Sequence, residues 1–215
     1  MTITHHPASD SLMSCSAGSM PESFAAVMAS HMAICSQCRK DLALMDDIGV
    51  ALLDQLSPSP MTEAAPVMAL RRLESETVPV TRPRQSTGDV PEPLVPVVGK
   101  YLDDIKWKKL APGISHYSIP LSMTGGGDLR LIKIAPGLAM PEHGHGGNEL
   151  TLILRGAYRD KTGHYKVGDL ADMSDDTEHQ PVADAKEGCI CLVATEGKLR
   201  FKTLLARLMQ PLTGM

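Results

Sequence analysis

The spacing of apolar residues changes character about halfway along the 215-residue chain. In the first part, apolar side chains recur every three or four residues, a period that predicts helices. We expect a short helix over residues 9–17, a second from about Ser19 to Ile34, a third over Ser36–Gln55 and a fourth over Thr62–Glu76. This part of the chain is therefore predicted to be a small helical bundle.

The predicted third helix carries an apolar stripe, formed by Leu42, Met45, Ile48, Leu52 and Leu53. A stripe of this kind is more typical of a core than of a binding face. A module of this size has little else to bury it against, so a partner is the alternative use for part of the stripe. The predicted fourth helix likewise has an apolar face that needs something to pack on.

The later part of the chain shows short alternating or wholly apolar runs, separated by Gly, Pro and Asp. The runs are Gly113–Leu121, Leu129–Ile134, Leu150–Leu154, Lys166–Leu170, Cys189–Ala194 and Leu199–Leu204. Repeated short runs with turn signals between them predict an antiparallel β-barrel or double sheet. The fold class expected for the chain is therefore α+β, with two domains.

The stretch Val78–Pro96 between the two parts contains five prolines and shows no periodicity. Such a composition is typical of an extended tether. We therefore divide the chain into a helical domain at residues 1–77, a Pro-rich linker at 78–96 and a β-domain at 97–215.

Three strong metal ligands lie within eight residues at the end of the predicted second helix. His31 and Cys35 are four residues apart and share a helix face, and Cys35-x-x-Cys38 has the commonest spacing for two thiolates on one zinc ion. A structural zinc site needs a fourth ligand, for which His5 and His6 are the candidates, with a slight preference for His6. A redox cysteine pair is the alternative, but it usually follows a β-strand, whereas both flanks here are predicted helices.

A second set of metal ligands lies in the β-part, where His143 and His145 alternate onto one side of an extended segment. Glu149 begins the next predicted strand after a glycine bend, and His179 follows a turn-rich stretch. Three histidines and one carboxylate form a metal site with room for an open position. The alternative, surface histidines in glycine-rich loops, is disfavoured because four ligands fall in register.

Cys189 and Cys191 share one face of a predicted strand. In an extended strand their Cα atoms lie about 6.5–7 Å apart, close to the upper limit for a disulfide. We interpret them as core thiols rather than a reactive pair, and a sensory role stays open.

Composition narrows the class of protein. Hydrophobic residues make up 43% of the chain, and its charge is close to balanced at -4. No apolar run approaches the roughly 18 residues of a membrane helix, and the N-terminus lacks the pattern of a signal peptide. Five cysteines, two of them in a Cys-x-x-Cys group, suit metal binding in a reducing compartment. We therefore expect a cytoplasmic protein without a membrane partner.

Residues 1–78 are acidic. They contain four basic and nine acidic side chains, a balance of 4 - 9 = -5. A helical module with that charge repels phosphate, which argues against direct binding of nucleic acid. It would be attracted to a basic protein partner.

The β-part matches a known sequence motif. The segment from Gly137 to Gly156 has the first cupin motif, Gly-x5-His-x-His-x3-Glu-x6-Gly, at every fixed position. The second cupin motif is matched at Gly168 and His179, and it departs at Ser174, Asp176 and Ala183. These departures concern the shape of a turn rather than the ligands.

A His-x3-Cys-x2-Cys helical module joined to a C-terminal cupin resembles the ChrR-type zinc anti-sigma factors, over essentially the whole chain. The resemblance implies two zinc ions and selects His6 over His5. The implied ligands are His6, His31, Cys35 and Cys38 for the first zinc, and His143, His145, Glu149 and His179 for the second.

The resemblance also implies a function. The N-terminal domain would bind and sequester an extracytoplasmic-function sigma factor, and the cupin would release it on oxidative stress such as singlet oxygen. The protein would then be a regulator and not an enzyme. The rival hypothesis is a metal-dependent cupin enzyme of the dioxygenase or isomerase type, because three histidines and a glutamate also hold iron or manganese. No further acid, base or aromatic cluster in the β-part suggests a substrate.

Overall fold

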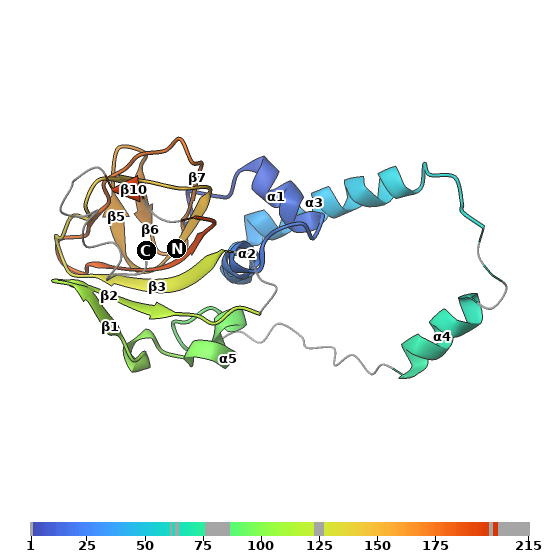
Figure 1. Ribbon diagram of the computed structural model, residues 1–215, viewed down its shortest axis with the longest axis horizontal. Coiled ribbons are helices and arrows are strands. Elements are labelled where there is room, and N and C mark those ends of the chain that lie inside the picture. Colours follow the sequence, from blue (N-terminus) through green and yellow to red (C-terminus); the bar gives the residue numbers. More distant parts are fainter. Residues whose placement is uncertain are drawn as a thin grey trace.

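The computed structural model describes residues 2–60, 62, 65–75, 87–122, 127–197 and 200–201. Helices form the N-terminal part and an antiparallel β-domain forms the C-terminal part, as predicted (Figure 1). The helices are α1 (Ser9–Ser16), α2 (Glu22–Ile34), α3 (Ser36–Leu53), α4 (Ala65–Ser75) and α5 (Val95–Val98), with the short turns η1 (Glu92–Leu94) and η2 (Leu102–Asp104). The first three predicted helices are confirmed to within three residues at their ends. Of the fourth, residues 63, 64 and 76 lie outside the described residues.

The strands are β1 (Lys108–Ala111), β2 (Ile114–Ser118), β3 (Asp128–Ile134), β4 (His143–Gly144), β5 (Glu149–Arg159), β6 (His164–Lys166), β7 (Leu170–Met173), β8 (Val182–Ala183), β9 (Cys189–Thr195) and β10 (Arg200–Phe201). Within the described residues, the main sheet runs in the order β1-β2-β3-β9-β5-β6, and β7 and β8 also pair with β5. Every strand pairing is antiparallel. The long strand β5 is therefore the centre of the β-domain.

Helix α2 packs on the β-domain and joins the two parts of the chain. Phe24, Val27 and Met28 are at most 5% exposed and belong to one core cluster with leucines of the strands. The leucines are Leu129, Leu131, Leu150, Leu152, Leu154, Leu170 and Leu192. Burying each large apolar side chain contributes about 1.5–3 kcal/mol to stability. The helices therefore share a core with the β-domain instead of enclosing one of their own.

The apolar stripe on α3 was expected to be part of a core, and this expectation is wrong for the second half of the stripe. Leu42 and Met45 are half-buried, whereas Ile48, Leu52 and Leu53 are 49%, 61% and 65% exposed. The reason is visible in Figure 1, where α3 extends beyond α1 and α2, and α4 stands apart from the other labelled elements. Among the described helices, none is long and apolar enough to cross a membrane.

The predicted linker needs a correction at its C-terminal end. Residues 76–86 lie outside the described residues, but 87–96 are folded and not an extended tether. Val90 and Leu94 are 1% and 3% exposed and join the same core cluster as α2. Proline is tolerated in the first turn of a helix, and both η1 and α5 have one there. The prolines therefore start short helical turns while the apolar residues between them are buried.

The predicted strand Lys166–Leu170 is interrupted. β6 ends at Lys166 and β7 begins at Leu170, with a turn between them in which the Asp169 nitrogen donates to the Lys166 carbonyl at 2.8 Å. Gly168 has a φ of +90°, a conformation that favours glycine. This turn lies next to the N-terminal segment of the chain, because the Leu170 nitrogen donates to the carbonyl of His5 at 3.1 Å.

Candidate metal centres

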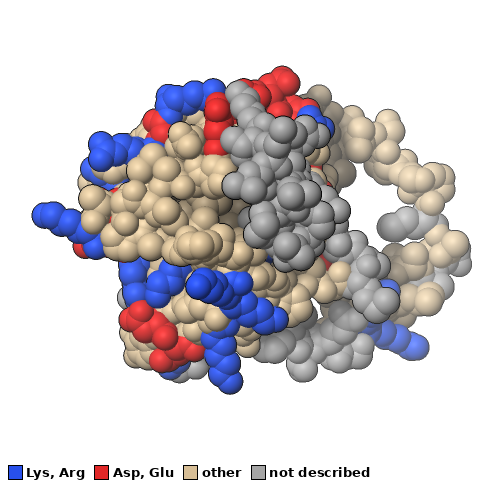
Figure 2. Space-filling view, turned by 60° about the vertical axis from the view of Figure 1, so that its left-hand side comes forward, with Lys and Arg blue, Asp and Glu red and all other residues tan. Residues whose placement is uncertain are grey.

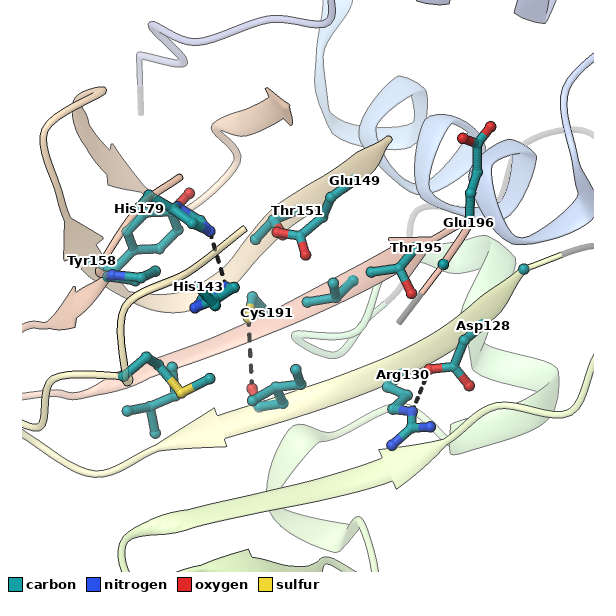
Figure 3. Close-up of a pocket in the computed structure, with 17 residues that line it drawn as sticks. Asp128, Arg130, His143, Glu149, Thr151, Tyr158, His179, Cys191, Thr195 and Glu196 are labelled. Carbon is teal, nitrogen blue, oxygen red and sulfur yellow. Dashed lines mark hydrogen bonds and ion pairs between the residues drawn. The ribbon is translucent and has the colours of Figure 1, made fainter. Parts of the chain in front are cut away.

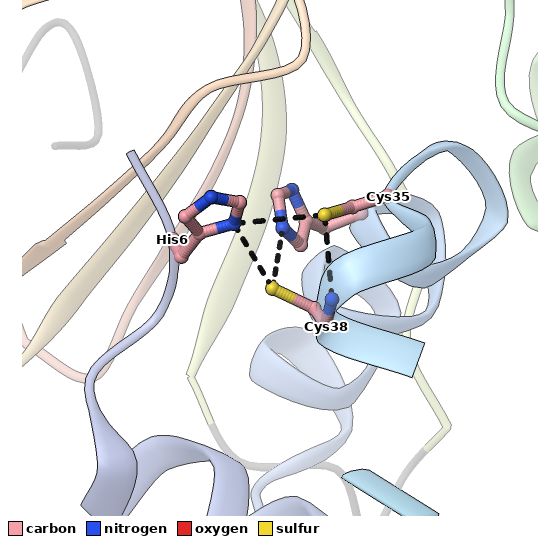
Figure 4. Close-up of side chains that lie close together, drawn as sticks. His6, Cys35 and Cys38 are labelled. Carbon is pink, nitrogen blue, oxygen red and sulfur yellow. Dashed lines mark hydrogen bonds between the residues drawn. The ribbon is translucent and has the colours of Figure 1, made fainter. Parts of the chain in front are cut away.

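Four candidate ligands meet where the N-terminal segment faces the helices. His31 lies in the last turn of α2, Cys35 lies between α2 and α3, and Cys38 lies in the first turn of α3. Cys35 also caps α3, because its sulfur accepts a hydrogen bond from the Cys38 nitrogen at 3.4 Å. His6 approaches from a separate segment on the opposite side (Figure 4). We call these four residues the helical centre.

The ligand atoms of the helical centre all lie within 4.8 Å of one another. His6 Nδ1 is 3.1 Å from Cys38 Sγ and 3.5 Å from Cys35 Sγ, and His31 Nε2 is 3.3 Å from Cys38 Sγ. Around a tetrahedral zinc with ordinary bond lengths, nitrogen and sulfur ligands lie ~3.6 Å apart. The spacing is therefore close to that of a four-coordinate zinc site.

Burial changes the pKa values of two ligands of the helical centre in ways that bear on metal binding. His31 is fully buried, and burial with the nearby His6 lowers its pKa to about 4, although Gly168 and Asp169 act in the opposite direction. Its ring is therefore neutral at neutral pH and has a lone pair to donate. Burial and the neighbouring Cys35 raise the pKa of Cys38 to about 12. A cation is needed to make this thiol a thiolate, which is the charge that zinc supplies.

The structure separates the two N-terminal histidines. His6 joins the thiols, whereas His5 faces the β-domain, where its Nδ1 lies 3.3 Å from Asp169 Oδ2. The His5 ring also packs against Tyr165, with the ring centroids 4.4 Å apart. Successive side chains of an extended segment point in opposite directions, so only one of the two can reach the cysteines.

The three histidines of the β-part form a second cluster, which we call the β-centre. His145 Nε2 and His143 Nε2 lie 3.2 Å and 3.1 Å from His179 Nε2. All three side chains are at most 3% exposed. His143 and His179 are paired across an isolated antiparallel bridge, with backbone hydrogen bonds of 3.1 Å and 2.9 Å. The pairing of these two segments places the rings side by side.

Two histidine rings of the β-centre are held in place by contacts of their Nδ1 atoms. The Nδ1 of His143 donates to the Pro141 carbonyl at 2.8 Å, and the Nδ1 of His179 contacts Asp160 Oδ2 at 2.7 Å. Such partners fix the tautomer and leave Nε2 available to a metal. Burial raises the pKa of Asp160, but its hydrogen bonds with His179 and Thr162 outweigh this and lower the pKa to about 2.

Asp160 was missed by the sequence analysis. It lies in the segment Asp160-Lys-Thr-Gly163, which has the composition of an ordinary turn. Its carboxylate does accept the turn bonds of Thr162 and Gly163, and the same side chain also reaches His179. No sequence signal distinguishes these two uses.

Glu149 does not join the three Nε2 atoms. One carboxylate oxygen lies 3.1 Å from His145 Nδ1, and the other accepts from the Thr151 hydroxyl at 3.0 Å. Burial raises the pKa of Glu149, but the contact with His145 and the charges of His143 and His179 outweigh this and lower the pKa to about 2. A negative charge is therefore stable beside the histidines, although the carboxylate lies outside their immediate group.

A cavity of about 340 Å³ opens beside the β-centre. Figure 3 shows His143, Glu149 and His179 on one side of it, with Cys191 between the histidines and the neighbouring strand. The wall is largely apolar and includes Ile132, Ile134, Met140 and Val193. Among the described residues, the hydroxyl of Tyr158, which also lines this cavity, is buried without a hydrogen-bond partner. The β-centre is therefore accessible from an apolar chamber.

Cys189 and Cys191 are free, buried core residues on β9, at 1% and 5% exposed, as expected for core thiols. The contact with Cys189, together with burial, raises the pKa of Cys191 well above its ordinary value. Cys191 lies opposite Ile132 and Ile153 in the sheet register. Both thiols are thus parts of the sheet interior, and Cys191 stays protonated at neutral pH.

Both donor sets suit a zinc ion. Two thiols and two imidazoles with short mutual distances are a common structural zinc set, and three buried imidazoles with a nearby carboxylate are a common set for a site that keeps an open position. The two groups are the ones that the sequence motifs singled out, except that the second group consists of the histidines alone.

Comparisons with known proteins agree over nearly the whole chain. The family model of the ChrR cupin-like domain matches residues 98–198. The anti-sigma-E factor ChrR of Cereibacter sphaeroides is 36% identical over 212 residues, which cover 98% of each chain. A crystal structure of Rhodobacter sphaeroides SigE in complex with the anti-sigma ChrR contains a chain that is 34% identical, with a TM-score of 0.75. This match covers 90% of the present chain and 100% of the other.

The β-domain is thus of the cupin type that the two sequence motifs predicted, and the match to the curated relative also covers the helical part of the chain. The chain belongs to the ChrR family of anti-sigma factors.

Proposed function

We propose that the protein binds and sequesters an extracytoplasmic-function sigma factor. The observation that carries the proposal is the apolar surface of α3 and α4, which we call the helical docking face. Its members are each 49% to 72% exposed and are Leu44, Ile48, Val50, Leu52, Leu53, Val67, Met68, Leu70 and Leu73. Large apolar side chains exposed in such number along two helices are typical of a protein interaction surface. A partner that fits between the two helices would bury both faces.

The relatives support this choice of partner. The similar chain of known structure comes from a complex of SigE with the anti-sigma ChrR. The acidic balance of residues 1–78 favours a basic protein over nucleic acid. On the face of the molecule in Figure 2, groups of Lys and Arg side chains have Asp and Glu beside them. We therefore infer regulation through protein binding, in the cytoplasm and without direct contact with DNA.

Two zinc ions are part of the proposal. The helical centre would hold the first with His6, His31, Cys35 and Cys38, as a structural staple between α2, α3 and the N-terminal segment. The β-centre would hold the second with His143, His145 and His179, and Glu149 would supply the fourth ligand from its position beside His145. Residues 1–77 would act as the inhibitor and residues 97–215 as the sensor, and residues 78–96, which are folded from residue 87 onward, would connect them.

The β-domain would be the sensor that releases the sigma factor on oxidative stress, such as singlet oxygen. A metal centre beside an apolar chamber suits this role, because a small uncharged oxidant can enter the chamber without a desolvation cost. The chamber is lined by Met140, whose thioether oxidants convert to the sulfoxide.

Binding of the full-length chain to its cognate sigma factor tests the proposal. Co-purification of the wild-type pair should be lost in Leu53→Asp and in Leu70→Asp, because each places a charge in the helical docking face. Val97→Asp, at a 44% exposed position on α5, is the matched control and should leave the complex intact. Retention of the sigma factor by both docking-face variants would reject this surface.

An enzymatic role is the second candidate, and the cavity beside the β-centre is the observation that favours it. An open position on a metal next to an apolar chamber is the arrangement of many metal-dependent oxygenases and isomerases. Iron loading followed by a screen for oxygen consumption with small dicarbonyl and phenolic compounds would detect such an activity. Turnover that His143→Ala abolishes would support it.

A further inference from the structure

The N-terminal segment is tied to the β-domain before it reaches the helices. Asp169, in the turn between β6 and β7, accepts hydrogen bonds from the backbone nitrogens of Thr4 at 2.7 Å and His5 at 3.0 Å. Its other oxygen accepts from the Lys166 nitrogen at 2.9 Å. Asp169 is only 1% exposed. A buried carboxylate keeps such donors firmly, because leaving it without them is costly.

The same segment is held on both sides of His6. On one side, the His5 carbonyl accepts from the Leu170 nitrogen at 3.1 Å. On the other side, the Ala8 nitrogen donates to Asp172 Oδ2 at 2.9 Å. Both contacts are with β7. The backbone around His6 is therefore fixed to this strand, directly before α1 begins at Ser9.

His6 differs in origin from the other ligands of the helical centre. His31, Cys35 and Cys38 lie on α2, on α3 or on the single residue between them, so their mutual positions are set by the short junction of the two helices. His6 comes from outside this unit and is exposed, and only the direction of its backbone aims its ring at the two sulfurs (Figure 4). The contacts with β7 set that direction.

β7 also reaches the β-centre. Its register against β5 pairs Leu170 with Leu152 and Met173 with Glu149. Glu149 in turn contacts His145 at 3.1 Å. One four-residue strand therefore connects the anchor of His6 with the carboxylate beside the three histidines.

We propose that Asp169 and Asp172 are positioning residues for the helical centre, and that β7 links the ligand His6 to the state of the β-centre. A shift of β7 withdraws His6 while the other three ligands stay on the helices. The helical centre then has three ligands and binds its metal less tightly. This inference rests on the proposed metal occupancy of the two centres and deepens the proposed function, because it gives the sensor a route to the inhibitor.

Cobalt(II) binding to the full-length chain tests the positioning role. Thiolate-to-cobalt absorption reports the helical centre, and Cys38→Ser should abolish it. Asp169→Asn should weaken cobalt binding at this centre by ~10–100-fold, the usual effect of losing a residue that orients a ligand. Asp104→Asn, at an exposed aspartate of the same domain, is the matched control and should change nothing.

A double substitution distinguishes positioning from general support of the fold. In a His6→Ala background the ligand is already absent, so Asp169→Asn should cause little further loss of cobalt affinity. An equal loss with and without His6, or a single variant that binds cobalt as tightly as the wild type, would overturn the positioning role.

A second variant keeps the test decisive if Asp169→Asn does not fold. Ala8 has a φ of -65°, which suits proline, so Ala8→Pro removes only the N–H donor to Asp172. It should lower cobalt affinity at the helical centre by a smaller factor than Asp169→Asn. An unchanged affinity in Ala8→Pro would count against the anchor.

The link through β7 has its own readout. His143→Ala empties the β-centre and should weaken cobalt binding at the helical centre, and this effect should disappear in Asp169→Asn. An unchanged helical centre in His143→Ala would refute the link. A wild-type chain without a thiolate band would instead remove the proposed metal at the helical centre. Because no sigma factor is needed, failure of the proposed partner is detected separately, by co-purification.

Discussion

The two metal centres are built in opposite ways. In the β-centre, buried strand and loop segments hold three histidines at most 3% exposed, and Pro141 and Asp160 orient two of the rings from behind. In the helical centre, the ligands come from the N-terminal segment and from two helices, and one of them, His6, is exposed. Strand and loop packing places the ligands of the β-centre, whereas a metal at the helical centre would join pieces of the chain that are separate in sequence.

This difference suits the two proposed roles. A preformed site can lose, exchange or alter its metal while the surrounding domain stays folded, as a sensor requires. A site that holds helices together converts a change in metal binding into a change of structure, as a releasable inhibitor requires.

The largest effect is expected from removing a ligand of the helical centre. Cys38→Ser should lose one of two metals per chain and disorder the junction of α2 and α3, because structural zinc contributes about 10–16 kcal/mol of binding free energy. Elemental analysis and circular dichroism measure the two losses. His145→Ala is the counterpart in the β-centre, and it should lose one metal without losing helix. An equal loss of helix in both variants would show that the helical centre does not differ from the β-centre in its structural role.

The next effect concerns the shared core. Met28 is fully buried between α2 and the strands, so Met28→Ala should lower the free energy of unfolding by about 2–5 kcal/mol. Leu53→Ala, at a 65% exposed position, should change it by less than about 0.5 kcal/mol. Denaturant titration followed by fluorescence of Trp107 reports the β-domain. If Met28→Ala leaves the unfolding midpoint of the β-domain unchanged, the helices do not stabilise that domain.

The sequence predicted which histidines and cysteines lie close together better than it predicted their surroundings. The spacing of His31, Cys35 and Cys38 on a helix end, and the alternation of His143 and His145 along an extended segment, are local patterns that geometry converts directly into clusters of candidate ligands. The choice of His6 over His5 needed the resemblance, because from the sequence either neighbour can be the one that faces the cysteines.

Contacts between distant segments were beyond the sequence. The apolar face of α2 indicated a core but not that strand leucines complete it, and the prolines before Leu94 concealed a buried segment. Asp160 and Asp169 have the local signature of turn residues, although each also holds a partner far away in the chain. A long-range contact of a turn residue leaves no periodic pattern in the sequence.

A smaller effect is expected from the residue that orients His179. Asp160→Asn should weaken metal binding at the β-centre by ~10–100-fold and leave the helical centre unchanged. Competition with a chromophoric chelator measures both affinities in one titration. Asp104→Asn serves again as the control. A loss of metal affinity confined to the helical centre would show that the contact of Asp160 with His179 does not orient a ligand of the β-centre.

The smallest effect is a pH dependence of stability. Burial raises the pKa of Asp169, but hydrogen bonds from the backbone nitrogens of Lys166, Thr4 and His5 outweigh this and lower the pKa below its ordinary value. The stabilising contribution is therefore complete above pH ~4 and is lost as the pH falls through the lowered pKa. The difference in unfolding free energy between wild type and Asp169→Asn should shrink below that pH. A difference that stays constant from pH 7 to pH 3 would contradict the assignment.

The division between an inhibitor and a sensor is tested most directly by transcription from a promoter of the cognate sigma factor, in cells that carry His143→Ala and are illuminated with a photosensitiser. The account predicts full repression in the dark and little induction in the light, whereas the wild type is induced. Induction of His143→Ala to the wild-type level would show that the β-centre does not take part in release, and would contradict the account.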